Sequence, residues 1–329
     1  MRQEFVLSES FVNSSKNKQF WSLTKSLQIQ NRMKYIISYQ QPHQHYLDIE
    51  FIADQIQSDF VEIQLPAWRP GRYELGNFAK NIQRWNAFDQ HGKELRHEKI
   101  TKDCWKVHTR DVTQLHIRYN YFSNELNAGS TFLDATQVYV NPVNCCVYIP
   151  SRINESCEME LKIPPSFKVA CGLRQATGAN EIQLHAADFH ELADSPFMAS
   201  DSLQHNKFSC QGIEFNFWFQ GECRLDWEKL HTDFSRFCEF QLRMMKKAPF
   251  EQYHFLFQIV PYRMYHGVEH VHSTVIALGP GCNLMKDKLY EDLVGVSCHE
   301  LFHAWNIKTI RPVEMQPYDY TKENYSKLG

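Results

Sequence analysis

Two histidines and a glutamate near the carboxyl end of the sequence have the types and spacing of a metal-dependent hydrolase. His299 and His303 are four residues apart, so on a helix both side chains project from one face, about one turn apart. Two imidazole nitrogens in that arrangement can bind one zinc ion. Glu300 lies beside them, where its carboxylate can take a proton from a water that the zinc activates. The pattern therefore predicts a zinc site with Glu300 as the general base.

The same spacing also occurs on amphipathic helices that bind no metal, where the histidines are core or surface residues. The local context favours the metal site. Leu289, Leu293 and Val296 form an apolar stripe on a helix that we expect at about residues 287–306. Asn306, at the end of that helix, either orients a zinc-binding histidine or caps the helix.

The elements before this helix alternate between helix and strand. Residues 225–245 have apolar side chains at helical spacing, and apolar strands are expected at 253–260 and 273–278. A His-rich segment, 265–272, lies between these two strands. His266, His270 and His272 in it could share a strand face, as satisfied polar residues rather than a second metal site. A mixed α and β unit is expected from residue 224 onward.

Strand signals dominate the chain from residue 33 to residue 223. Apolar and polar residues alternate with a period of two, and turn-forming residues separate the runs. We expect antiparallel sheets packed as a sandwich, which with the later helices gives an α+β protein. Residues 1–32 are rich in Ser, Asn, Gln and Lys, and are expected to form a disordered tail. The clearest alternating runs are 46–51, 60–65, 105–108, 115–121 and 215–219.

Composition and charge give no indication of a nucleic acid or membrane partner. The 329 residues include 35 Lys and Arg against 38 Asp and Glu, a net charge of -3, so no general attraction to phosphate-rich partners is expected. No apolar stretch approaches the roughly 20 residues that span a bilayer, and no secretory signal is recognised. A cytoplasmic protein is expected. The ten cysteines lack a C-x-x-C pair and are expected to be free buried thiols.

Three segments together resemble the glycyl aminopeptidase family of metallopeptidases, family 61. They are HELFHAWNIK at 299–308 with IRP at 310–312, LPAWRPGRY at 65–73, and GVEH at 267–270. Their order and spacing cover nearly all of the chain from residue 33. In this interpretation Trp68 and Arg69 are structural residues of the amino-terminal domain.

The resemblance implies a β-rich amino-terminal domain at 33–223 and the first part of a thermolysin-like (gluzincin) catalytic domain at 224–329, usually followed by a PDZ domain. It implies a third zinc ligand, a Glu expected about four residues beyond Gly329. The chain is therefore expected to be a fragment that holds two of the three ligands. The implied activity is removal of amino-terminal residues such as Gly or Ala from a peptide.

Substrate binding is expected at Gly267, Glu269 and His270. A carboxylate just before an edge strand can hold the free α-ammonium of a peptide, and Glu269 is the candidate; a solvated strand-end Glu is the alternative. A second interpretation of the whole chain is a catalytically silent β-sandwich binding module with a remnant of the peptidase domain. Its exposed apolar surface would then associate with itself or with a partner.

Overall fold

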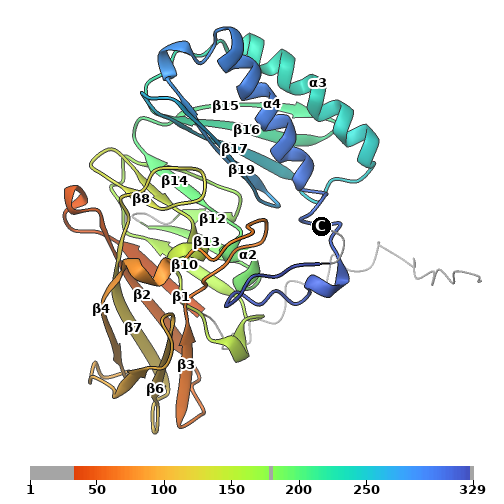
Figure 1. The fold of residues 1–329 in the computed structure, drawn as a ribbon. Helices are drawn as coiled ribbons and strands as arrows, with labels where there is room; N and C mark the ends of the chain where they lie inside the picture. Colours follow the sequence, from red (N-terminus) through yellow and green to blue (C-terminus); the bar gives the residue numbers. More distant parts are fainter. Residues whose placement is uncertain (1–32, 178–180, 327–329) are drawn as a thin grey trace, which may run out of the picture. The chain divides into compact units, whose positions relative to one another are not determined.

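The computed structural model describes residues 33–177 and 181–326. The tail expected at residues 1–32 lies outside the described residues. Within them the chain is rich in strands and has few helices, which confirms the predicted α+β class. Figure 1 shows the strands gathered into several sheets, with the two long helices against one of them.

Seven of the described strands form one sheet, in the order β12-β13-β10-β1-β2-β7-β4. In β2, Leu47, Ile49 and Phe51 are buried and alternate with more exposed residues, as the predicted period of two requires. The predicted antiparallel pairing holds for this sheet except between β1 and β10, which pair in parallel. The long crossover between these two strands permits that pairing. The bounds are β1 Met33–Ser38, β2 Tyr46–Asp54, β4 Ile82–Phe88, β7 Gln114–Phe122, β10 Cys157–Leu161, β12 Arg174–Thr177 and β13 Ile182–Ala186.

Two smaller sheets and two short helices accompany this sheet. The described strands pair in the orders β3-β6-β5 and β11-β14-β9-β8, and β3 and β6 confirm the strands predicted at 60–65 and 105–108. Helix α2 begins after Asp188, whose side chain accepts a hydrogen bond from the Glu191 amide. The bounds are β3 Phe60–Gln64, β5 His97–Lys99, β6 Cys104–His108, β8 Phe132–Leu133, β9 Val138–Val140, β11 Lys168–Cys171, β14 Phe197–Ser200, α1 Pro142–Cys145 and α2 Phe189–Ala193.

A mixed sheet in the order β15-β16-β17-β19-β18 supports the candidate site. Phe255 and Phe257 of β17 pack into a core on one side of this sheet, whereas Leu256 packs into a core on the other. Burial on both faces explains the continuous apolar run in this strand. The domain boundary expected after residue 223 stays a prediction; β16 and β17 pair across that position. The bounds are β15 Gln204–Cys210, β16 Ile213–Gln220, β17 Gln252–Ile259, β18 Met264–Glu269 and β19 Ser273–Gly279.

Helices α3 (Trp227–Met245) and α4 (Asp287–His303) lie side by side over one face of this five-stranded sheet (Figure 1). Phe234 of α3 and both Leu293 and Val296 of α4 are buried in one core cluster with the phenylalanines of β16 and β17. The apolar stripe predicted for α4 is thus confirmed. Burial of this stripe leaves the opposite side of α4 to carry polar side chains.

Two details of the predicted elements were wrong. Helix α4 ends at His303 rather than at Asn306, because Ala304 N and Trp305 N donate to the carbonyls three residues before them and tighten the last turn. The strand face proposed for the three histidines does not exist, because β18 ends at Glu269. His270 and His272 lie in the turn that leads to β19.

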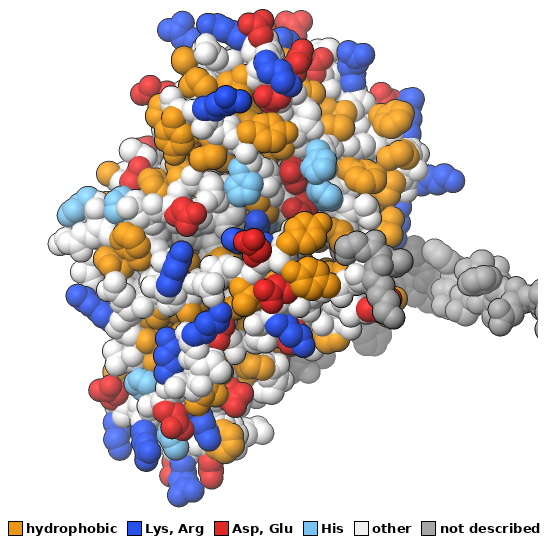
Figure 2. All heavy atoms as spheres, in the orientation of Figure 1, with side chains coloured by type: hydrophobic (Ala, Val, Ile, Leu, Met, Phe, Trp, Pro, Cys, Tyr) orange, Lys and Arg blue, Asp and Glu red, His pale blue; other side chains and the backbone are white. Residues whose placement is uncertain are grey.

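The remaining expectations concern the surface and the thiols. None of the ten cysteines, all within the described ranges, forms a disulfide; six are buried and Cys282 is exposed. On the face drawn in Figure 2, basic and acidic side chains are interspersed, in line with the nearly balanced composition. No helix in the described ranges is long and apolar enough to cross a membrane.

Candidate functional site

His299 and His303 project from the exposed side of α4 and converge at their Nε2 atoms, which are 3.0 Å apart. Two nitrogens on one tetrahedral zinc ion would be about 3.3 Å apart. The Nδ1 atom of His303 lies 2.7 Å from the Asn306 carbonyl oxygen. When Nδ1 donates its proton to that oxygen, Nε2 is left as the metal-binding nitrogen. The two side chains therefore fit a zinc ion.

Asn306 contributes through its main chain. Asn306 was predicted either to orient a zinc-binding histidine or to cap the helix. The structure shows its contact to His303, whereas the C-cap of the helix is Ala304. Across the ranges that the structure describes, no third His, Cys, Asp or Glu joins the two histidines in a metal-binding group.

Glu300, the helix neighbour of His299, lies against β18 and is only 6% exposed. Its carboxylate lies against Gly267 of β18, where any Cβ atom would overlap Oε1. Burial and the charge of Glu269 raise the pKa of Glu300 to about 8, and Arg69 and Lys308 partly oppose the shift. A carboxyl group with such a pKa is an effective proton acceptor near neutral pH.

Glu269 is the last residue of β18, the edge strand of its sheet, rather than a residue before that strand. Its Oε1 contacts Gly71, which has a φ of +91° and lies in the LPAWRPGRY segment. Gly267 and Glu269 line one cavity of about 460 Å³. A carboxylate in that position can accept hydrogen bonds from an ammonium group at the end of the strand.

His270 is placed differently from the other two predicted substrate residues. Its side chain is 4% exposed and its Nδ1 lies 3.1 Å from Asp194 Oδ1. Burial lowers the pKa of His270, and Asp194 only partly opposes this. His270 lines a separate cavity of about 390 Å³ that does not include Gly267 or Glu269. The structure thus brings together Gly267, Glu269 and Glu300, but not His270.

The sequence interpretation missed a buried ion pair beside this site. Lys308 Nζ lies 2.8 Å from Asp194 Oδ1, and the Val271 amide donates to Asp194 Oδ2. Burial alone would raise the pKa of Asp194, but Lys308 and His270 outweigh it and hold that pKa well below its usual range. Lys308 is the last residue of the HELFHAWNIK segment, so the sequence could have identified it as a candidate site residue. Asp194 is 114 residues away from it and gave no local signal.

Arg69 and Trp68 were predicted to be structural. Trp68 is buried, and its Nε1 donates to the Arg72 carbonyl at 2.6 Å, which agrees with that role. Arg69 lines both cavities, and its shielded Nε has no hydrogen-bond partner among the described residues. Its charge also acts on Glu300. Arg69 is therefore part of the surroundings of the site.

Two family models match this chain. The model described as the peptidase M61 N-terminal domain matches residues 34–201, about half of the chain, and the model described as M61 glycyl aminopeptidase matches residues 292–329. The second match contains both histidines and Glu300. No curated protein sequence matches the chain.

Solved structures resemble it as well. An aminopeptidase N family protein from Idiomarina loihiensis is 28% identical with a TM-score of 0.82, over 89% of this chain and 51% of that protein. An M1 zinc metallopeptidase from Deinococcus radiodurans is 12% identical with a TM-score of 0.49, over 84% of this chain and 63% of that protein. The chain thus spans about half the length of the first of these structures.

Proposed function

Because the chain belongs to the M61 peptidase family, we propose that it forms the amino-terminal domain and part of the catalytic domain of a zinc-dependent aminopeptidase. The observation that carries the proposal is the convergence of the His299 and His303 Nε2 atoms on the helix that also buries Glu300. From the family resemblance, the third zinc ligand is a Glu about four residues beyond Gly329.

In the proposed reaction, bound zinc supplies Lewis acidity for a carbonyl and a water molecule. Glu300 accepts the proton of the attacking water and later delivers it to the leaving amine. Its raised pKa suits both steps, because the group can be either protonated or ionised near neutral pH. Glu269 binds the free α-ammonium of the substrate, and this contact selects amino-terminal residues, with Gly and Ala as the proposed substrates.

A zinc titration tests the proposal on this chain and on a version extended by about 150 residues, the size of an ordinary further domain. Tight one-to-one binding is expected in the extended version and weak binding here. His303→Ala should abolish it, whereas His43→Ala, a substitution in the short helical turn Pro42–Gln44, should not. Tight binding by this chain alone would place the third ligand within residues 1–329 and contradict the assignment beyond Gly329.

Activity is then measured on the extended version with glycine and alanine p-nitroanilides. Glu300→Gln should keep zinc and lower kcat by about 10²- to 10⁴-fold. The control is Glu291→Gln, an exposed acid on the same helix. An extended protein that binds zinc tightly but cleaves no free-amine substrate would favour the silent binding module instead.

A further inference from the structure

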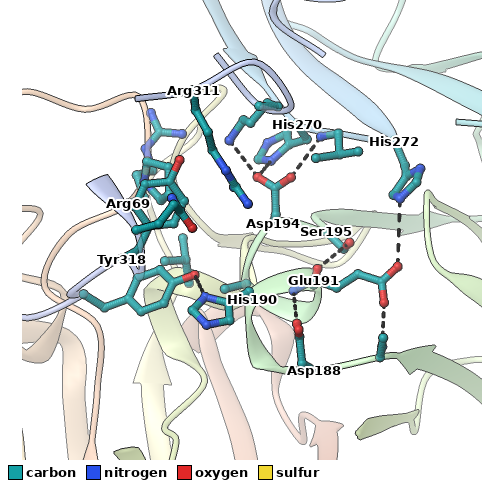
Figure 3. A pocket seen from close by; sticks show the side chains of 18 residues that line it. Arg69, Asp188, His190, Glu191, Asp194, Ser195, His270, His272, Arg311 and Tyr318 are labelled. Carbon is teal, nitrogen blue, oxygen red and sulfur yellow. Dashed lines mark hydrogen bonds and ion pairs between the residues drawn. The ribbon is translucent and has the colours of Figure 1, made fainter. Parts of the chain in front are cut away.

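The cavity of about 390 Å³ has a wall built from several parts of the chain. These are Arg69 with Pro70, Val143, the segment around α2, the turn between β18 and β19, and the segment 308–320 after α4. Figure 3 shows their side chains gathered around one space, with Arg69 and Arg311 on the side opposite His272. This cavity is distinct from the one that holds Gly267 and Glu269.

Each acidic side chain in this wall already has a partner. Asp188 Oδ1 accepts from the Glu191 amide at 2.8 Å. Glu191 Oε2 accepts from the Ala187 amide at 2.5 Å. Asp194 is held by Lys308, His270 and the Val271 amide. These three carboxylates are therefore engaged by protein donors.

The guanidinium groups of Arg69 and Arg311 also line this cavity, but in the described part of the chain they lack such partners. Among the described residues, neither Arg69 nor Arg311 forms an ion pair with a carboxylate; the shielded Nε of Arg69 has no hydrogen-bond partner, and Arg311 is exposed. Arg311 lies over the ring of Tyr318, 5.4 Å from its centre. Burial lowers the pKa of Arg69, and the charges of Glu269 and Asp194 only partly oppose this. Both groups present donors in the fork geometry that matches a carboxylate.

His270 adds an unsatisfied acceptor. Its Nδ1 contacts Asp194 and its side chain is 4% exposed, yet Nε2 has no partner among the described residues. With the Nδ1 proton directed at Asp194, Nε2 carries a lone pair that can accept an N–H or O–H. A buried polar atom without a partner destabilises the folded chain, and a hydrogen bond from a ligand donor would offset that loss.

We propose that this cavity binds a small molecule with one carboxylate and one N–H donor, the chemistry of a free amino acid. The carboxylate is held by the guanidinium groups of Arg69 and Arg311, and the N–H donates to His270 Nε2. The site does not depend on zinc or on the proposed peptidase activity, because none of these residues is one of the two histidine ligands.

The test is calorimetric titration of this chain with glycine, acetate, methylamine and inorganic phosphate, in the presence of phenanthroline so that metal-bound ligand does not contribute. Glycine should bind once per chain, acetate more weakly, and methylamine and phosphate not measurably. Arg311→Gln should weaken glycine binding about tenfold or more, the loss expected for a charge-assisted contact. Arg69→Lys, which keeps the charge but not the fork, should also weaken it.

Arg72→Gln is the matched control, because Arg72 lines the other cavity only. Far-ultraviolet circular dichroism shows whether each variant keeps its fold. Absence of glycine and acetate binding at millimolar concentration would overturn the proposal. So would glycine binding by both Arg311→Gln and Arg69→Lys that is as tight as binding by the parent chain. Phosphate binding as tight as that of acetate would overturn the carboxylate assignment.

Discussion

At the scale of single residues, burial of Glu300 raises its pKa, which suits a proton acceptor near neutral pH but also destabilises the folded chain. In the folded chain its pKa is about 8, against about 4.3 for an unperturbed Glu. Between these values the folded state keeps a proton that the unfolded state has lost. The free energy of unfolding contributed by this group therefore decreases as pH rises from about 4 to about 8.

Glu300→Gln removes this titration. We expect the metal-free variant to match the parent chain near pH 4.5 and to be more stable at pH 8 by on the order of 3 kcal/mol. Urea unfolding at both pH values, with phenanthroline present, measures the difference. Glu291→Gln, whose side chain is 73% exposed, should show no such pH dependence. A stability gain of equal size at both pH values would show that Glu300 does not titrate as described.

Glu269 gives a second prediction for a single residue. In the extended protein, Glu269→Gln should raise KM for glycine p-nitroanilide about tenfold to a hundredfold, because a charge-assisted contact to the α-ammonium is lost. Zinc affinity should not change. Glu74→Gln, a substitution of an exposed acid directly after the LPAWRPGRY segment, serves as the control. Unchanged kinetics in Glu269→Gln would leave this Glu as a solvated strand-end residue, the alternative given by its sequence position.

At the scale of elements, two glycines let strand β18 and the LPAWRPGRY segment approach the two carboxylates closely. Gly267 makes room for Glu300 and Gly71 for Glu269. Gly71 also has a φ of +91°, so its substitution combines backbone strain with steric overlap. Gly92 has a similar φ of +79° with no atom within 4 Å of an added Cβ. Comparing substitutions at Gly71 and Gly92 therefore separates the cost of steric overlap from the cost of backbone strain.

Gly71→Ala should therefore cost more stability than Gly92→Ala, by about 1–3 kcal/mol, the usual cost of an overpacked position. In a Glu269→Ala background the two glycine substitutions should become equivalent, because the overlapping carboxylate is gone. Urea unfolding of the single and double variants measures both quantities. An unchanged difference in that background would mean that Gly71 is required for a reason other than Glu269.

The elements also show what the sequence could and could not predict. Alternating burial in β2 and the stripe of α4 depend on local periodicity, so both were predicted close to their observed bounds. The pairing of β1 with β10 depends on residues more than a hundred positions apart and has no local signature. Gly71 and Glu269 are also far apart in the sequence, and no local pattern connects them.

At the scale of the whole molecule, Asp194 joins segments that are far apart in the sequence. It follows α2 and binds the turn between β18 and β19 through His270 and Val271, and the segment after α4 through Lys308. The side chains of Lys308 and Asp194 are 5% and 21% exposed, so neither charge is well solvated. Removing one partner leaves the other charge buried without compensation.

Asp194→Asn should therefore destabilise the chain by about 3–5 kcal/mol at pH 7, measured by urea unfolding. Asp59→Asn, which removes an exposed pair with Arg110, should cost less than about 1 kcal/mol. Replacing both buried partners, as Asp194→Asn with Lys308→Met, should recover much of the loss, because no buried charge is then left alone. If the double variant were as unstable as the single one, Asp194 would act through His270 and Val271 rather than through Lys308. A single-variant cost below about 1 kcal/mol would show that the ion pair does not couple these segments.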